Sequence, residues 1–310
     1  MKKELIYEMT SPYRDTFRIR GFRFGEGEET VAIVGPMRGD EVQQQYICAQ
    51  LVTELQQIER RGEICDGKSI LVIPTCNPFS LNVNSRFWSM DNTDINRMFP
   101  GYDKGETTQR IADAIFQRIK DYKYGMQLAS YYVPGDFIPH VRMLKTGYEA
   151  VEEAKLFGMP YVTVRKPLPF DTTLLNYNWQ IWESKAFSIY AGHTDKIDQQ
   201  STRLTLNAIL RFIRKVGVTE RKVPMMSHHS VVFDESVLIN LQAHHAGILQ
   251  HIQVAGAQVT AGDTLARITD PLTGDILEEL KTPVSGVVFF THNRPLIYQN
   301  ALLYKILPFT

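Results

Sequence analysis

An excess of charge of either sign is absent from this sequence, because 34 lysine and arginine residues are matched by 34 aspartate and glutamate residues. Nucleic-acid-binding and membrane-surface proteins commonly carry a basic excess. A long apolar run is absent too, and the charged start Met-Lys-Lys-Glu-Leu-Ile-Tyr-Glu is not followed by the apolar stretch of a signal peptide. We therefore expect neither a nucleic-acid nor a membrane partner, and any charge-based recognition has to be local.

Cysteine is scarce as well. The three residues Cys48, Cys65 and Cys76 form an odd set without a C-x-x-C pair, which favours buried or free thiols in a reducing compartment. The sequence thus predicts a cytoplasmic protein. Cys76 follows a predicted strand, but no nearby histidine indicates an activated thiol. Ser130 has no general base assigned to it from the sequence, so a covalent mechanism is not favoured.

Short apolar runs alternate with amphipathic segments through the first two-thirds of the chain. The runs are rich in β-branched residues and end at glycine or proline, as strands do, whereas the longer segments repeat apolar residues at helical spacing. The predicted strands are 29–34, 69–74, 161–164 and 186–190, and the predicted helices are 41–59, 105–121 and 202–215. This alternation predicts an α/β domain around a central mixed, mainly parallel sheet flanked by helices.

The pattern changes after about residue 223. Helical periodicity stops, and short apolar runs recur between turns such as Ala-Gly-Asp and Leu-Thr-Gly-Asp. Residues 242–268 resemble residues 281–306 weakly, which predicts a small all-β domain built from two similar halves. We therefore predict an α/β domain over 1–225 and a β-rich, barrel-sandwich-like domain over 226–310. No lysine sits at a hairpin tip between small residues, so a lipoyl- or biotinyl-carrier role is not favoured.

Two segments carry the most informative motif. Residues 31–41 read Val-Ala-Ile-Val-Gly-Pro-Met-Arg-Gly-Asp-Glu, and residues 86–101 fit the spacing R-x4-D-x2-D-x-N-R-x-F-P-G. Together they resemble the succinylglutamate desuccinylase/aspartoacylase family of zinc-dependent amidohydrolases. The resemblance extends over nearly the whole chain and implies a carboxypeptidase-like fold followed by the family's C-terminal β domain.

The resemblance also exposes a departure at the metal site. The family binds zinc through the histidine and glutamate of G-x-x-H-G-x-E and through a histidine on a later strand. In this chain Arg38 takes the place of the first histidine, Glu41 is retained, and Ala129 takes the place of the second histidine. An arginine side chain is permanently cationic and offers no lone pair to a metal ion. One of three ligands is left.

The family's catalytic glutamate lies in a T-x-E-x-G strand, which is best matched here by Ser-Ile-Tyr-Ala-Gly at 188–192. Tyr190 therefore stands at the position of the general base. A phenol with an ordinary pKa near ~10 is a poor base at neutral pH. Loss of the two histidines and of the base together argues against zinc hydrolysis.

The carboxylate-binding part of the family motif is retained. Asn96 and Arg97 match residues that hold the substrate carboxylate, and Arg86 matches a third polar position. A guanidinium pairs well with both oxygens of a carboxylate. The alternative is that Arg97 is a structural residue paired with Asp94 or Asp91.

Arg38 and Glu41 lie three residues apart where the predicted helix begins, so we expect them to form an ion pair. Arg38 would then supply positive charge at the zinc position and attract an anionic ligand without generating hydroxide. Relocated histidines are the alternative, and His140 and His193 are the candidates closest in sequence to Ala129 and Tyr190.

Two functions follow from these observations. The favoured one is a degenerate, catalytically inactive relative of N-acyl amino acid deacylases that needs no cofactor. It binds a small carboxylate or acyl-amino-acid ligand, or it acts as a non-catalytic subunit beside an active paralogue or in a homo-oligomer. The alternative is an active metal-dependent hydrolase of amide C–N bonds, with zinc held at a rearranged site.

Overall fold

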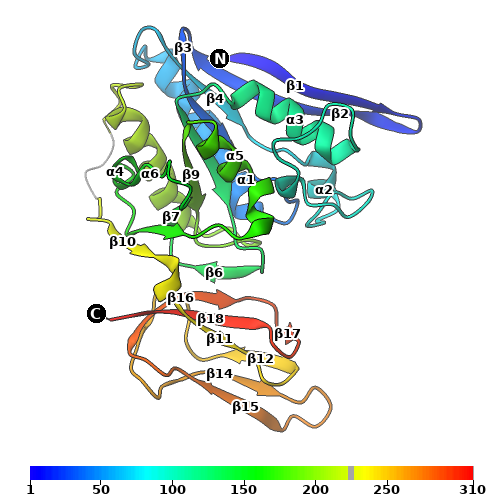
Figure 1. Cartoon of the computed structure of the whole chain (residues 1–310), viewed down its shortest axis with the longest axis vertical. Coiled ribbons are helices and arrows are strands. Elements are labelled where there is room, and N and C mark those ends of the chain that lie inside the picture. The colour runs from blue at the N-terminus through cyan, green and yellow to red at the C-terminus, as the bar shows by residue number, and fades with distance from the viewer. Residues whose placement is uncertain (223–226, 310) are drawn as a thin grey trace.

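The structure, a computed structural model, describes residues 1–222 and 227–309. A large α/β domain forms one end of the molecule and a β sandwich forms the other (Figure 1). A long N-terminal hairpin of β1 (Lys2–Ser11) and β2 (Arg14–Gly25) lies along the edge of the large domain. In the described part of the chain, no helix combines the length and apolarity that crossing a bilayer requires.

The large domain is organised around a mixed sheet, which has nine strands within the described residues. Its order is β1-β2-β4-β3-β5-β9-β7-β8-β10. The remaining strands are β3 (Glu28–Val34), β4 (Lys68–Ile73), β5 (Tyr124–Ala129), β7 (His140–Leu144), β8 (Tyr161–Arg165), β9 (Lys185–Tyr190) and β10 (Val231–Asp234). Strands β3, β4, β5 and β9 run parallel, whereas β7 is antiparallel to β9. The carboxyl ends of β3, β5 and β9 therefore meet at one edge, where ligands of open α/β sheets commonly bind.

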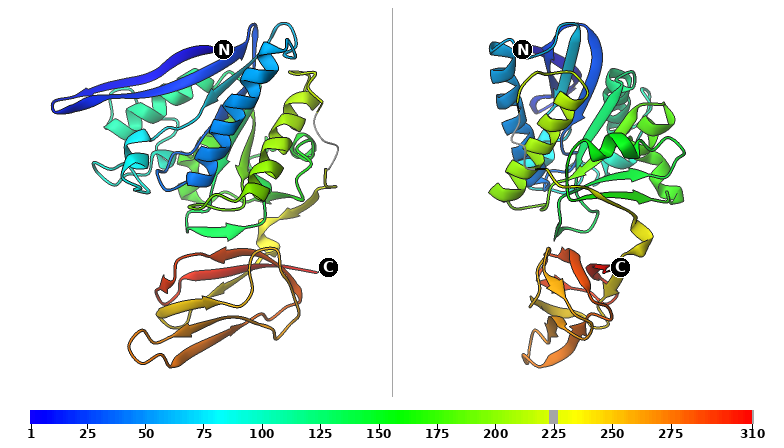
Figure 2. Two further views of the ribbon diagram at one scale, coloured as in Figure 1. Left: turned by 180° about the vertical axis from the view of Figure 1, so that it is seen from behind. Right: turned by 90° about the vertical axis from the view of Figure 1, so that its left-hand side faces the viewer.

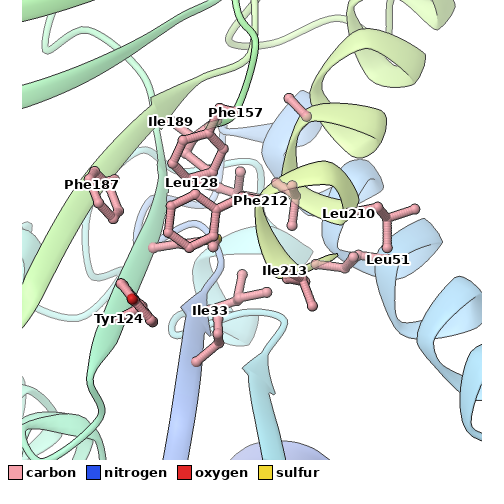
Figure 3. Packing of buried hydrophobic residues seen from close by; sticks show 14 of the residues in the cluster. Ile33, Leu51, Tyr124, Leu128, Phe157, Phe187, Ile189, Leu210, Phe212 and Ile213 are labelled. Carbon is pink, nitrogen blue, oxygen red and sulfur yellow. The ribbon is translucent and has the colours of Figure 1, made fainter. Parts of the chain in front are cut away.

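Helices cover both faces of this sheet (Figures 1 and 2). One apolar core lies under α1 (Val42–Arg60), α4 (Val151–Lys155) and α6 (Gln199–Lys215). The other lies under α2 (Pro78–Asn82), α3 (Thr107–Ile119) and α5 (Leu175–Ile181). Figure 3 shows the first core, where Phe212 of α6 stacks on Phe157 with ring centroids 4.3 Å apart. On the other face, the Trp179 ring of α5 packs directly on Gly125, where any side chain would clash.

The predicted elements of the first domain are confirmed, with ends shifted by a few residues. The strand over 29–34 begins at Glu28, and the helix over 202–215 begins at Gln199, where Asp198 caps it by accepting a hydrogen bond from the Ser201 N–H. The hairpin β1–β2 was not predicted. Residues 176–182, an aromatic segment, form α5 and bury Trp179.

The C-terminal domain is the small all-β unit that the sequence predicts. One sheet has the order β11-β18-β16-β13 and packs against a second of order β15-β14-β12-β17, with an apolar core between them. The strands are β11 (Ile239–Gln242), β12 (Gly247–His251), β13 (Gln258–Val259), β14 (Thr264–Thr269), β15 (Ile276–Lys281), β16 (Gly286–His292), β17 (Leu296–Ile297) and β18 (Leu302–Pro308). The two similar sequence segments correspond to β12–β14 and β16–β18.

The two domains exchange short elements across their boundary. Strand β10 follows residue 226 yet pairs with β8 of the large sheet, so the chain enters the sandwich through the 3-10 turn η3 (Glu235–Val237). In the other direction, β6 (Gly135–Phe137) of the large domain pairs with β16. The structural boundary thus lies nearer to Glu235 than to the residue 225 expected from the sequence.

Candidate functional site

A pocket of about 330 Å³ opens at the carboxyl ends of the central strands. Arg38 enters it from the loop after β3, Ala129 from the end of β5 and Tyr190 from the end of β9. Ala129 and Tyr190 are direct partners in the β5–β9 ladder. The structure therefore brings together positions that lie far apart in the sequence, as the family motif requires.

Arg38 lies between two carboxylates at the inner end of this pocket. It donates to Glu41 Oε1 at 3.2 Å and to Asp94 Oδ2 at 2.8 Å, which confirms the predicted Arg38–Glu41 pair. The Arg38 side chain is only 5% exposed. Burial opposes its charge, but Glu41 and Asp94 outweigh that effect and raise the pKa of Arg38 above its ordinary value. Two carboxylates thus already compensate this guanidinium, which leaves less attraction for an anionic ligand than Arg38 alone suggests.

The residues at the family's metal positions do not suit a zinc ion. Glu41 accepts hydrogen bonds from Arg38 and, at 2.7 Å, from the Ser130 hydroxyl, so its oxygens are engaged. Ala129 offers no side-chain donor, and the guanidinium fills the space beside Glu41. Across residues 1–222 and 227–309, no group of three histidine, cysteine, aspartate or glutamate side chains is placed to hold a metal ion.

Tyr190 is unsuited to the work of a general base. Its side chain is 2% exposed, and burial raises its pKa above the ordinary value for a phenol, although Arg142 opposes this shift. The Arg142 guanidinium carbon lies 4.3 Å from the centre of the Tyr190 ring. The ring therefore serves as a cation–π platform for Arg142 on the pocket wall.

Asn96 and Arg97 both line the pocket. Gln127 donates to Asn96 Oδ1 at 3.0 Å. Because this bond uses the amide oxygen of Asn96, its amide N–H groups point away from Gln127 and can donate to a ligand. Arg97 donates to the Phe170 carbonyl at 2.8 Å and lies 3.8 Å from Asp171, while its side chain is 25% exposed. Arg97 thus pairs with Asp171 rather than with Asp94 or Asp91, and retains donors for a ligand.

Arg86 is engaged elsewhere. It donates from one nitrogen to both oxygens of Asp40, at 3.0 and 2.9 Å, and from the other to the carbonyls of Tyr131 and Tyr132. It is not among the residues that line the pocket. In this structure Arg86 therefore fixes the 131–132 segment to the loop after β3, and both of its terminal nitrogens are engaged in these contacts.

Neither relocated histidine reaches the pocket lining. His140 is fully buried and stacks on Tyr190 at 4.6 Å, and burial lowers its pKa to about 3. His193 bonds through Nδ1 to Asp136 at 2.8 Å. The geometry thus gives no support to a metal site rebuilt on these two side chains.

Sequence reasoning missed five charged residues that line the same pocket, one of which is Asp171. Arg142 of β7, Arg165 at the end of β8 and Lys305 of β18 converge on Glu235. The sequence signal for such residues is a lone charge within an otherwise apolar strand, as in His-Val-Arg-Met-Leu and Leu-Leu-Tyr-Lys-Ile. Such a charge is costly to bury unless it is paired or binds a ligand.

A family model and a named relative match this chain. The family model described as "Succinylglutamate desuccinylase/Aspartoacylase catalytic domain" matches residues 28–215. A relative from Halomonas elongata, N-alpha-acetyl-L-2,4-diaminobutyric acid deacetylase, is 26% identical over 263 residues, which cover 79% of this chain and 72% of the relative.

Solved structures share the fold over nearly the whole chain. A succinylglutamate desuccinylase from Silicibacter is 18% identical, with a TM-score of 0.81 and coverage of 97% of this chain and 91% of that structure. The product-bound ectoine utilization protein EutE (DoeB) from Ruegeria pomeroyi is 19% identical, with a TM-score of 0.80 and coverage of 94% and 89%. At these identities the likeness shows the carboxypeptidase-like fold alone. Since the family model matches more than half of its residues, the chain belongs to the succinylglutamate desuccinylase/aspartoacylase family.

Proposed function

We propose that this member of a deacylase family binds a small carboxylate-bearing ligand, of the N-acyl amino acid type, without hydrolysing it by the family's zinc chemistry. The observation that carries this proposal is Arg38, whose guanidinium stands between Glu41 and Asp94 where a metal ion would need free ligands. A permanent cation at this position repels a divalent ion and donates no lone pair.

The pocket itself supports ligand binding. Asn96 and Arg97 face a cavity of about 330 Å³, the lower end of the range for small-molecule sites. Tyr132 and Phe170 flank Arg97, with ring centres 5.8 and 5.0 Å from its guanidinium carbon. A carboxylate bound to this guanidinium and to the Asn96 amide would form charge-assisted hydrogen bonds.

Metal content and ligand binding test the two halves of the proposal separately. Elemental mass spectrometry after zinc loading and desalting is expected to find fewer than about 0.1 zinc per chain, because a tetrahedral site needs about three protein ligands. The double variant Arg38→His/Ala129→His restores two ligands beside Glu41 and is expected to retain zinc. Stoichiometric zinc in the unaltered protein would refute the first half.

For the second half, isothermal titration calorimetry with N-acetyl-L-alanine is the direct measurement. Arg97→Gln is expected to weaken binding about tenfold or more, since a hydrogen bond to a charged group contributes roughly 1.5–3 kcal/mol. Arg267→Gln, at an exposed ion pair with Glu279 in the sandwich, is the matched control. Equal affinities for the two variants would remove Arg97 from the site.

An active deacylase is the second candidate, and the Halomonas elongata relative, whose name is that of a deacetylase, favours it. The structure adds one contact that hydrolysis could use: the Ser130 hydroxyl donates to Glu41 Oε1 at 2.7 Å. Release of acetate from N-acetyl amino acids, measured with chelator and with added zinc, decides between the two functions. Turnover abolished by chelator would restore a metal site, whereas turnover lost only in Ser130→Ala would indicate a serine nucleophile.

A non-catalytic subunit role, in which this chain assembles with an active relative or with itself, is the alternative to ligand binding for an inactive member of the family. Sedimentation velocity of the full chain, alone and after co-expression with a zinc-binding relative, tests this directly. A monomer under both conditions would leave ligand binding as the remaining proposed function.

A further inference from the structure

The large sheet ends at β1, whose outer edge has no strand beside it. Within the described chain β1 pairs with β2 alone, and Figure 1 shows it along the outside of the large domain. It is ten residues long, whereas β10 at the opposite edge of the sheet has four. Natural edge strands are commonly short, because the free N–H and C=O groups of a long one are a template for pairing with another chain. The length of β1 therefore marks its edge as an interaction surface.

An irregularity in β1 brings side chains of opposite charge onto one of its faces. From their odd spacing, Lys3 and Glu8 would lie on opposite faces of a regular strand. Here the pairing with β2 shifts register after Leu5, and Lys3 lies opposite Phe22. Glu8 lies opposite Arg18, an even number of residues before that position in β2. Lys3 and Glu8 therefore point to the same face.

The order of charges along β1 is self-complementary when two copies pair antiparallel about a twofold axis. In one register, Lys3 of each copy lies opposite Glu8 of the other, so the symmetry forms the same ion pair twice. The axis then passes between Leu5 and Ile6, where the register shift of β1 begins. In the adjacent registers that keep the faces matched, Lys3 meets Ile6 or Thr10, so neither compensates its charge.

The side chains that this pairing uses are free to make it. Lys3 and Glu8 are exposed, and Lys3 forms no hydrogen bond or ion pair with any other described residue. Glu8 binds Arg18 of its own hairpin through Oε2, which leaves Oε1 for a cation of a second chain. Leu5 points to the same face as Lys3, is 58% exposed and lies beside the axis, so pairing also removes apolar surface from water.

We propose that β1 is a dimerisation surface, on which a second copy of this chain adds its own β1 in antiparallel orientation. The large sheets of the two copies then continue into one. Charge complementarity selects a second copy as the partner, because a strand that fits must carry an acid opposite Lys3 and a base opposite Glu8, as β1 itself does. No residue of β1 lines the pocket, so this inference is independent of what the pocket binds.

Sedimentation velocity of the full chain over a concentration series tests the interface. A contact made by one pair of strands is small, so we expect a monomer at about 1 µM and mainly dimer at about 100 µM at low ionic strength. Added salt is expected to shift the equilibrium towards monomer, because the Lys3–Glu8 pairs are exposed to solvent and are screened. A monomer over the whole series would overturn the proposal.

Two charge reversals test the register. Lys3→Glu sets acids opposite each other in a homodimer and Glu8→Lys sets bases opposite each other, so each variant alone is expected to dimerise about tenfold more weakly. In an equal mixture of the two variants, an acid again lies opposite a base at both ends of the pairing, and the dimer is expected to return. Lys281→Glu, at an exposed position of β15, is the control and is expected to dimerise like the unaltered chain. Thermal unfolding verifies that each variant is folded.

Recovery in the mixture distinguishes pairing through β1 from a hairpin that is merely disturbed. Each chain in the mixture keeps its own substitution, so a damaged hairpin would stay damaged, whereas complementary strands would pair. A dimer that neither reversal weakens, or one that mixing does not restore, would overturn the assignment of the interface to β1.

Discussion

In the variant Arg38→Met, two buried carboxylates lose the cation that stands between them. Glu41 and Asp94 are 3% and 9% exposed, so water replaces little of the lost interaction. Methionine fills similar space and matches the apolar stem of arginine, which limits the effect to the charge and its hydrogen bonds. The variant therefore measures how strongly the protein depends on the cation that takes the place of the metal.

The expected loss is large. Removing one partner of a buried ion pair typically costs about 3–5 kcal/mol, because the remaining charge is left uncompensated. Here one guanidinium serves two carboxylates. The donors that stay in the variant are neutral: the Ser130 hydroxyl and the backbone N–H of residue 38 donate to Glu41, and the Asn96 backbone N–H donates to Asp94. We therefore expect a decrease of about 3–5 kcal/mol in the free energy of unfolding at pH 7.5.

Urea unfolding followed by tryptophan fluorescence provides the measurement. The control is Arg267→Met, which removes an exposed pair with Glu279 and is expected to cost less than about 1 kcal/mol. A loss in Arg38→Met as small as in the control would refute the reasoning.

Three further outcomes follow from the same structure. His140 has a folded-state pKa of about 3, below its unfolded value, because burial disfavours the charged imidazole. The neutral His140 therefore costs no stability above about pH 6.5, and as the pH falls towards 3 the free energy of unfolding decreases by up to roughly 1.4 kcal/mol per pH unit. His140→Phe should flatten the measured pH dependence of unfolding, and an unchanged slope would contradict this. Gly39→Ala should cost more than about 2 kcal/mol in the same assay, because its Cβ would lie 2.3 Å from the Ser80 carbonyl carbon; a neutral substitution would contradict the packing. Burial raises the thiol pKa of Cys48 and Cys76, so native alkylation read by mass spectrometry should modify Cys65 first, and early labelling of Cys76 would be inconsistent with it.

The local sequence pattern was sufficient to predict most strands and helices of the large domain. Strands such as β3 and β4 are continuous apolar runs, and α6 repeats its apolar residues at helical spacing, so both kinds of element could be predicted from sequence. The hairpin β1–β2 was missed because charged residues recur through both strands, so neither shows the continuous apolar run of β3 or β4. Its pairing depends on contact with β4, which no single segment encodes.

The residues of the candidate site were likewise predicted only where the pattern that marks them is local in sequence. Asn96 and Arg97 were predicted because their motif is continuous in sequence, and the Arg38–Glu41 pair because its spacing is local. Arg142 and Lys305 were missed because they meet only after β7 enters the large sheet antiparallel to β9 and β18 folds into the sandwich. That juxtaposition is set by long-range register rather than by neighbouring residues.

Strand β6 links the large domain to the sandwich by strand pairing. It leaves the large domain and supplies the outer partner of β16, so it closes an edge of the sandwich that would otherwise present free backbone groups. A fragment that begins after residue 226 would expose this edge and invite strand pairing between chains, which leads to aggregation or domain swapping. Residues 135–137 therefore protect a strand edge of a domain that starts some hundred residues later, and the sandwich should be expressed and engineered only together with them.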